Sequence, residues 1–90
     1  MEFEFDPAKS AINKRKHGID FIEAQALWAP GAGLMIPARF ADEERYAVIG
    51  VLGEKLWVGF FILRGGIIRI MSVRRARDEE KRRYEDHIRS

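Results

Sequence analysis

Residues 69–77, with the sequence RIMSVRRAR, contain four arginines and no acidic residue. A guanidinium group stays charged at every physiological pH, and its planar fork can donate two hydrogen bonds to one phosphate group. A cluster of this kind favours an anionic partner, with nucleic acid ahead of a membrane surface. The alternative is a solvated basic surface that binds nothing.

The length of 90 residues suits one small domain, residues 1–90, with a single modest hydrophobic core. Hydrophobic residues make up 47% and charged residues 33%, which is typical of a globular fold rather than of disorder. The chain has no cysteine, so disulfides and cysteine-based metal sites are excluded. No apolar run approaches the ~20 residues of a membrane span, and the acidic start MEFEFDP is unlike a secretory signal. We therefore expect a cytoplasmic protein that spans no membrane.

Local signals place helices in the first third of the chain. The alternation in residues 3–5 predicts a short strand. The Asp-Pro pair at 6–7 begins a helix that ends at Gly18, since glycine readily adopts the left-handed conformation of a C-cap. A D-x-x-E capping box at 20–23 begins a second helix over 21–28.

The remainder of the chain predicts strands followed by one helix. The Gly-Gly pair at 65–66 indicates a hairpin, because both central positions of a type I′ turn need positive φ. A last helix is expected over 78–88, with acidic residues in its first turn. The element order β-α-α-β-β-β-β-α predicts an α+β fold: a small antiparallel sheet with two N-terminal helices and one C-terminal helix. The expected strands of its second half are 34–36, 45–52, 56–63 and 67–73.

The hairpin also predicts where the arginines point. A tight turn at Gly65-Gly66 places Ile62 opposite Arg69 and Trp57 opposite Arg74. A charge within an apolar strand cannot enter a dry core unpaired without a large cost in free energy. Arg69 therefore implies either a buried carboxylate partner or a sheet face that is open to solvent near the other arginines of the segment. An open face suits a binding groove.

Three segments of the chain, together with Tyr84, keep the order and approximate spacing of a known family: FEFDPAKSAINKRKHGIDFIEA (3–24), ERYAVIG (44–50) and RIMSVRRA (69–76). With these segments the chain resembles the BrnT family, the toxins of type II toxin–antitoxin modules. The resemblance implies a RelE-like fold and a ribonuclease that arrests translation by cutting RNA. It also implies neutralisation by a BrnA-like ribbon-helix-helix antitoxin, with operator DNA bound only through that antitoxin.

The chain departs from the family pattern at three places. It has Ile62-Leu63 where BrnT-like sequences usually carry Thr-Glu, and Gly66-Ile67 where they often carry Asp-Arg. Arg77 replaces the hydroxyl residue that usually caps the last helix, so Asp78 is expected to cap it instead. Because the chain lacks this carboxylate and this basic residue near the implied site, we expect an altered or weaker nuclease.

RNA cleavage without a metal ion needs three things: a base for the 2′-hydroxyl proton, an acid for the leaving 5′-oxygen, and positive charge at the phosphate. The sequence has no D-x-D or H-x-x-x-H pattern, so we expect neither a metal nor another cofactor. Arginine would supply the positive charge. Arg69 and Arg74 are expected at the scissile phosphate and Arg75 at an adjacent one.

The other candidate site residues each have a structural alternative. His17 is a candidate general base or only closes the first helix, and Tyr84 is a candidate proton donor or part of a buried stripe. Lys16 binds RNA or is a solvated helix end. Arg45 contacts RNA or pairs with its acidic neighbours Glu43 and Glu44. Trp57 stacks on a base or lies in the core.

Two classes of function therefore remain open from the sequence. One is an endoribonuclease toxin, and the other is a non-catalytic basic module that docks an acidic partner or nucleic acid. A DNA-binding domain is disfavoured, because the last helix interleaves charges of both signs instead of presenting a basic recognition surface.

Overall fold

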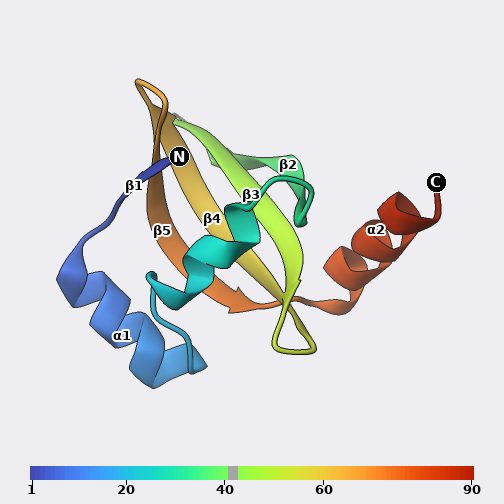
Figure 1. Cartoon of the computed structure of the whole chain (residues 1–90), viewed down its shortest axis with the longest axis horizontal. Helices are drawn as coiled ribbons and strands as arrows, with labels where there is room; N and C mark the ends of the chain where they lie inside the picture. Colours follow the sequence, from blue (N-terminus) through green and yellow to red (C-terminus); the bar gives the residue numbers. More distant parts are fainter. Residues whose placement is uncertain (41–42) are drawn as a thin grey trace.

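A computed structural model of the chain describes residues 1–40 and 43–90 and confirms the α+β class (Figure 1). The strands form one sheet in the order β1-β5-β4-β3-β2. No helix in these ranges is long and apolar enough to cross a membrane. In chain order the elements are β1 (Glu2–Glu4), α1 (Pro7–His17), the 3₁₀ helix η1 (Glu23–Trp28), β2 (Gly33–Phe40), β3 (Glu43–Leu52), β4 (Lys55–Arg64), β5 (Ile67–Arg75) and α2 (Asp78–Arg89).

Three expectations about these elements are wrong in detail. The strand expected over 34–36 is longer, because β2 spans Gly33–Phe40 and continues past Pro37. The sheet is mixed rather than antiparallel, because β1 pairs in parallel with β5 over residues 67–69. The second helical segment is a 3₁₀ helix and not an α-helix. A repeat of three residues per turn aligns Phe21, Ala24 and Leu27, and all three are buried. The predicted capping box is confirmed, because Asp20 and Glu23 each accept a hydrogen bond from the other's backbone N–H.

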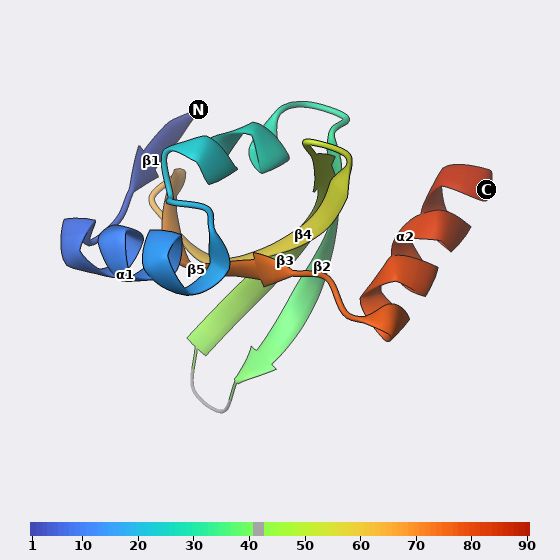
Figure 2. The same cartoon turned by 90° about the horizontal axis from the view of Figure 1, so that it is seen from below.

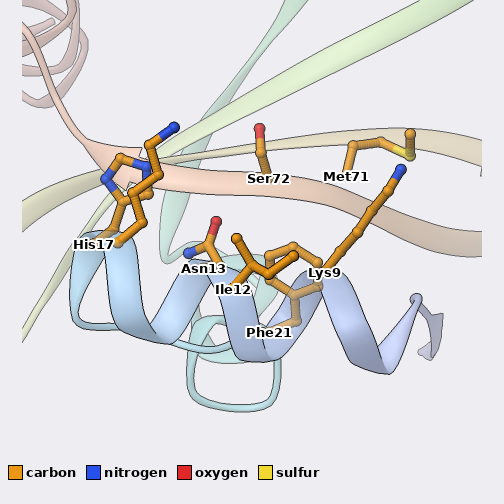
Figure 3. A pocket seen from close by; sticks show the side chains of 8 residues that line it. Lys9, Ile12, Asn13, His17, Phe21, Met71 and Ser72 are labelled. Atoms are coloured by element: carbon orange, nitrogen blue, oxygen red, sulfur yellow. The ribbon is translucent and has the colours of Figure 1, made fainter.

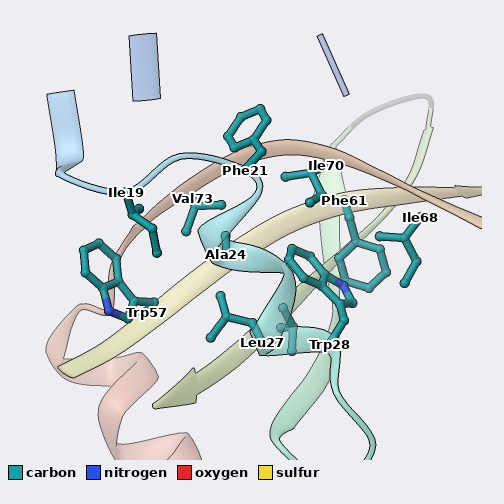
Figure 4. Close-up of a cluster of buried hydrophobic side chains, with 11 residues drawn as sticks. Ile19, Phe21, Ala24, Leu27, Trp28, Trp57, Phe61, Ile68, Ile70 and Val73 are labelled. Carbon is teal, nitrogen blue, oxygen red and sulfur yellow. The ribbon is translucent and has the colours of Figure 1, made fainter. Parts of the chain in front are cut away.

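The hydrophobic core lies between η1 and one face of the sheet, which we call the covered face (Figure 4). Trp28 of η1 makes edge-to-face contacts with Phe3 and Phe61, at centroid distances of 5.7 and 5.4 Å. A Cβ atom on Gly59 would lie 2.6 Å from the Trp28 ring. Glycine at this position is therefore what allows the indole to reach the sheet.

The opposite face of the sheet, which we call the arginine face, is covered only in part. Ala76 and the partly buried Tyr84 of α2 pack there against buried residues of β3 and β4, including Ile49 and Val58. Both views show α2 well apart from α1 and η1 (Figures 1 and 2). The rest of this face carries polar side chains, among them Arg45, Arg69 and Arg74.

Helix α1 is held to the sheet by an asparagine. The Asn13 side chain donates to the carbonyl of Val73 at 2.9 Å and accepts from the Val73 N–H at 3.1 Å. It also donates to the carbonyl of Ile19 at 2.8 Å. Because β1 pairs with β5 only over residues 67–69, the amide stands where a neighbouring strand would otherwise bond. Asn13 is only 6% exposed, so these bonds form away from water.

The hairpin of β4 and β5 contains a β-bulge that the sequence did not reveal. Near the turn the predicted register is confirmed, with Ile62 opposite Arg69. Beyond Phe61 the register shifts, because Met71 has no partner of its own on β4. The expected pairing of Trp57 with Arg74 is therefore wrong, and Arg74 lies opposite Val58 instead. An extra residue of this kind reverses which face the following side chains occupy.

We predict that Asn13→Ala destabilises the protein by about 2–4 kcal/mol, because it leaves buried backbone groups of Val73 and Ile19 without partners. Asn13→Asp should also be destabilising, since a carboxylate cannot donate to the two carbonyls. Urea unfolding followed by circular dichroism measures both effects. Arg15→Ala, on the exposed side of the same helix, is the control and should change the unfolding free energy little. An unchanged Asn13→Ala midpoint would contradict this role.

The C-cap of α1 provides a second prediction. Gly18 has φ of +82° and its N–H donates to the carbonyl of Lys14 at 2.9 Å. Gly18→Val should lower the unfolding free energy by about 1–3 kcal/mol, because a β-branched residue is strained at positive φ. Gly18→Asn should be nearly neutral, since asparagine tolerates this conformation. Equal melting temperatures for the valine and asparagine variants would show that the strain is absent.

Candidate functional site

Two pockets meet at Ser72 and form one basic surface, which we call the basic strip. The α1 pocket, of 190 Å³, lies between α1 and β5 (Figure 3). The arginine-face pocket, of 260 Å³, lies on the arginine face. None of the described residues that line either pocket is acidic. The α1 pocket is lined by Lys9, Ile12, Asn13, Lys16, His17, Phe21, Met71 and Ser72, and the arginine-face pocket by Arg45, Phe60, Ser72, Arg74 and Arg77.

Local structure explains why these side chains gather. Lys9 and Lys16 are seven positions apart on α1, so both point toward the same side of the helix, with His17 beside them. Ser72 follows the extra residue of the β-bulge and projects away from α1 (Figure 3). Ser72 is the residue that lines both pockets. Bulges commonly re-aim side chains at functional sites in this way.

Arg74 is held in place by several contacts. Its two terminal nitrogens donate to the two carboxylate oxygens of Glu80, each at 2.8 Å. Nη1 also donates to the carbonyl of Arg75 at 3.1 Å. The guanidinium lies over the ring of Phe60, 5.0 Å from its centroid. The side chain is 21% exposed, so it is fixed in place but still reaches solvent.

Glu80 connects this arginine to the start of α2. Its Oε1 atom accepts a hydrogen bond from the N–H of Arg77 at 2.8 Å. Arg77 itself occupies the N-cap position, so the expectation that Asp78 caps the helix is wrong. The side chain of Glu80, the third residue of the helix, caps the N–H of Arg77. The helix therefore begins without an N-cap side chain that carries an oxygen. Hydrogen bonds from Arg74 hold the pKa of Glu80 below its usual value, against the opposing effect of partial burial.

Arg69 lies on the same face as Arg74 but outside both pockets. The alternatives for this residue were an open face and a buried carboxylate partner, and the structure combines features of both. Its Nη1 is 3.5 Å from Oε1 of Glu4, and the two side chains are 30% and 38% exposed. In the sheet it belongs to a row that crosses from Glu4 through Ile62 to Arg45.

Arg75 and Trp57 lie on the opposite side of the sheet from Arg74. The Arg75 guanidinium is 5.5 Å from the centroid of the Trp57 ring. Trp57 is 8% exposed, and its indole N–H donates to the carbonyl of Leu52 at 3.0 Å. Of the two alternatives for Trp57, the structure shows the core position. The β-bulge separates Arg75 from Arg74, although the two are neighbours in sequence.

The remaining candidate residues divide between the strip and the core. Lys16 and His17 line the α1 pocket, and Arg45 lines the arginine-face pocket. The alternative pairing of Arg45 with Glu43 or Glu44 concerns side chains outside the described residues. Tyr84 lines neither pocket and packs with the hydrophobic side chains under α2.

Sequence reasoning missed eight of the twelve residues that line the strip. The i, i+7 spacing of Lys9 and Lys16 was an available signal for one of them. Arg77 was signalled by the arginine-rich segment 69–77, although it was not a named site candidate. Phe60 and Ser72 had no such signal, because their placement depends on the β-bulge. Within residues 1–38 and 45–90, whose side chains the structure describes, no group of three or more histidine, aspartate or glutamate side chains could hold a metal ion.

A comparison with protein families gives this arrangement its context. The family model described as "Ribonuclease toxin, BrnT, of type II toxin-antitoxin system" matches residues 5–80. The chain belongs to the BrnT family. The matched range includes every residue that lines the basic strip. This BrnT-family protein is thus a ribonuclease toxin of a type II toxin–antitoxin system, with RNA as its substrate and an antitoxin as its partner. No curated protein matches the chain significantly.

The ion pair beneath the strip predicts a specific pH dependence. Because the pKa of Glu80 is lower in the folded chain than its usual 4.5, ionised Glu80 stabilises the fold fully above that value. This stabilisation is lost as the pH falls through the lowered pKa. The difference in unfolding free energy between the wild type and Glu80→Gln should therefore be constant near neutral pH and shrink on acidification below 4.5.

Urea unfolding at a series of pH values measures this difference. Glu79→Gln, an exposed neighbour in the same helical turn, is the matched control and should show a smaller difference from the wild type at neutral pH. A Glu80→Gln difference that does not change with pH would contradict the assignment of the pKa shift to the ion pair.

Proposed function

We propose that this BrnT-family toxin is a metal-independent endoribonuclease that cuts RNA on the basic strip and thereby inhibits translation in the cytoplasm. The observation that carries the proposal is the union of two basic pockets at Ser72, with no acidic residue among the described residues that line them. Such a surface attracts a phosphate backbone and concentrates positive charge where a phosphate would lie. The RelE-like fold that the sequence resemblance implies is consistent with a site carried by a small sheet.

The proposed reaction is an attack by the ribose 2′-oxygen on the adjacent phosphorus. The bond from the 2′-oxygen to phosphorus forms, the bond to the 5′-oxygen breaks, and a 2′,3′-cyclic phosphate and a 5′-hydroxyl result. His17 is the proposed base that takes the 2′-hydroxyl proton, because it reaches the strip from α1. Arg74 and Arg45, from the other pocket, stabilise the negative charge that grows on the phosphate.

Other residues of the surface serve the flanking nucleotides in this proposal. Lys9 and Lys16 contact the backbone on the α1 side, and Arg69 contacts it beyond Arg45 on the arginine face. Trp57 and Tyr84 have structural roles, because both pack in hydrophobic clusters. The leaving 5′-oxygen receives its proton from the protonated His17 or from solvent.

The partner in this proposal is a BrnA-like ribbon-helix-helix antitoxin, which neutralises the toxin and alone contacts operator DNA. The same basic strip would also suit an acidic segment of such a partner. A non-catalytic docking role for the strip is therefore the competing proposal, and it makes a different prediction for Arg74.

We predict that the purified protein cuts single-stranded RNA in the presence of EDTA and that Arg74→Ala slows this cleavage about 10²–10³-fold, by analogy with the loss of an oxyanion donor. Arg74→Lys should restore only part of the rate, because an ammonium group cannot make a bidentate contact. Arg83→Ala, on the exposed surface of α2, is the control and should cut RNA at the wild-type rate.

Arg74→Ala also leaves Glu80 without its partner, so rates are compared at a temperature where circular dichroism shows every variant folded. Cleavage by folded Arg74→Ala at the wild-type rate would refute the catalytic role of the strip. If Arg74→Ala cut RNA at the wild-type rate but no longer bound the antitoxin, the docking proposal would replace the catalytic one.

A further inference from the structure

Among the described residues, hydrogen bonds occupy one of the two bonding edges of the Arg74 guanidinium. Arginine has five N–H donors, one on Nε and two on each terminal nitrogen. Both donors of Nη1 are used, by Oε1 of Glu80 and by the carbonyl of Arg75. One donor of Nη2 is used, by Oε2 of Glu80. In the described part of the chain, Nε–H and the second Nη2–H have no hydrogen-bond acceptor.

These two remaining donors are parallel and lie on the other edge of the group. A parallel pair of N–H donors is the arrangement that binds two oxygens of one phosphate. Arg74 lines the arginine-face pocket together with Arg45 and Arg77. A carboxylate on one edge and a phosphate on the other can therefore bind the same guanidinium without competing for donors.

We infer that Glu80 is a positioning residue, which holds one edge of Arg74 so that the other edge is presented to an RNA phosphate. This inference rests on the proposed function and adds to it a residue outside the pocket lining. The carboxylate of Glu80, the carbonyl of Arg75 and the ring of Phe60 fix the guanidinium on three sides. An arginine held in this way loses less side-chain freedom when it binds phosphate.

Glu80 is itself well placed to act as a fixed anchor. Its side chain is 20% exposed, and Oε1 also accepts the N–H of Arg77. No described residue of α2 is fully buried, so the helix is not held by a large apolar face. A main contribution of α2 to the site is then to deliver this carboxylate to Arg74.

The kinetic test compares Glu80→Gln with the matched control Glu79→Gln. Glu80→Gln keeps the charge of Arg74 and removes a negative charge next to the strip. We expect kcat to fall about 10-fold, as for a modest misplacement of a catalytic group, while KM for RNA stays the same or decreases. Glu79→Gln removes the same charge one position away and should leave kcat unchanged.

A double-mutant cycle separates positioning from simple stabilisation of α2. In the Arg74→Lys background, which has no guanidinium edge to hold, Glu80→Gln should cause little further loss of kcat. The same 10-fold loss in both backgrounds would mean that Glu80 acts through the fold alone and would overturn the inference. A higher kcat for Glu80→Gln would also overturn it, because Glu80 would then restrain Arg74 rather than present it.

A second measurement does not depend on cleavage. In protein labelled with ¹⁵N-arginine, the Nε–H signal of Arg74 should show a high order parameter in the wild type and in Glu79→Gln, and a low one in Glu80→Gln. Inorganic phosphate should shift this signal in the wild type. If no variant cuts RNA but these signals behave as expected, the proposed function fails while the positioning by Glu80 holds. An Arg74 signal that is equally ordered without Glu80 would overturn the inference.

Discussion

The amide of Asn13 is the contact on which the arrangement of this protein depends. The β2–β5 meander leaves the outer edge of β5 open, and β1 covers that edge only over residues 67–69. Asn13 satisfies the backbone of Val73 just beyond this point and ties in the carbonyl of Ile19. A polar side chain can do this only with every bond made, because an unpaired buried backbone group is costly. One residue thus fixes α1, the segment that leads to η1, and the α1 side of the basic strip.

The β-bulge at Met71 determines which charges cooperate. In a regular strand Arg69 and Arg74, five positions apart, would point to opposite faces. The extra residue places both on the arginine face and leaves Arg75 over the Trp57 ring on the other side. Clustering in the sequence is therefore a poor guide to clustering in space. The strip takes one arginine of the Arg74-Arg75 pair and collects its other cations from α1, β3 and the start of α2.

The positively charged side chains on this small sheet repel one another, and carboxylates placed beside two of the arginines offset part of that repulsion. Glu4 lies beside Arg69 and Glu80 beside Arg74, so carboxylates support the arginines from the side while the described pocket linings stay free of acid. The better ion pair belongs to the arginine nearer the pocket. Its bidentate geometry at 20–21% exposure makes it stronger than the looser, more exposed contact of Arg69.

The sequence by itself determined the α+β class, the N-cap Asp6 and the C-cap Gly18 of α1, the capping box at Asp20 and the hairpin at Gly65-Gly66. These features depend on backbone preferences within a few residues, so local sequence is sufficient to predict them. Its motifs also indicated the BrnT family.

Tertiary structure alone decided the rest. The parallel pairing of β1, the 3₁₀ form of η1, the bulge and the partner of Asn13 depend on which segments distant in sequence meet. The composition of the basic strip follows from those contacts, because a single inserted residue in β5 reverses the side of the sheet on which each later side chain lies.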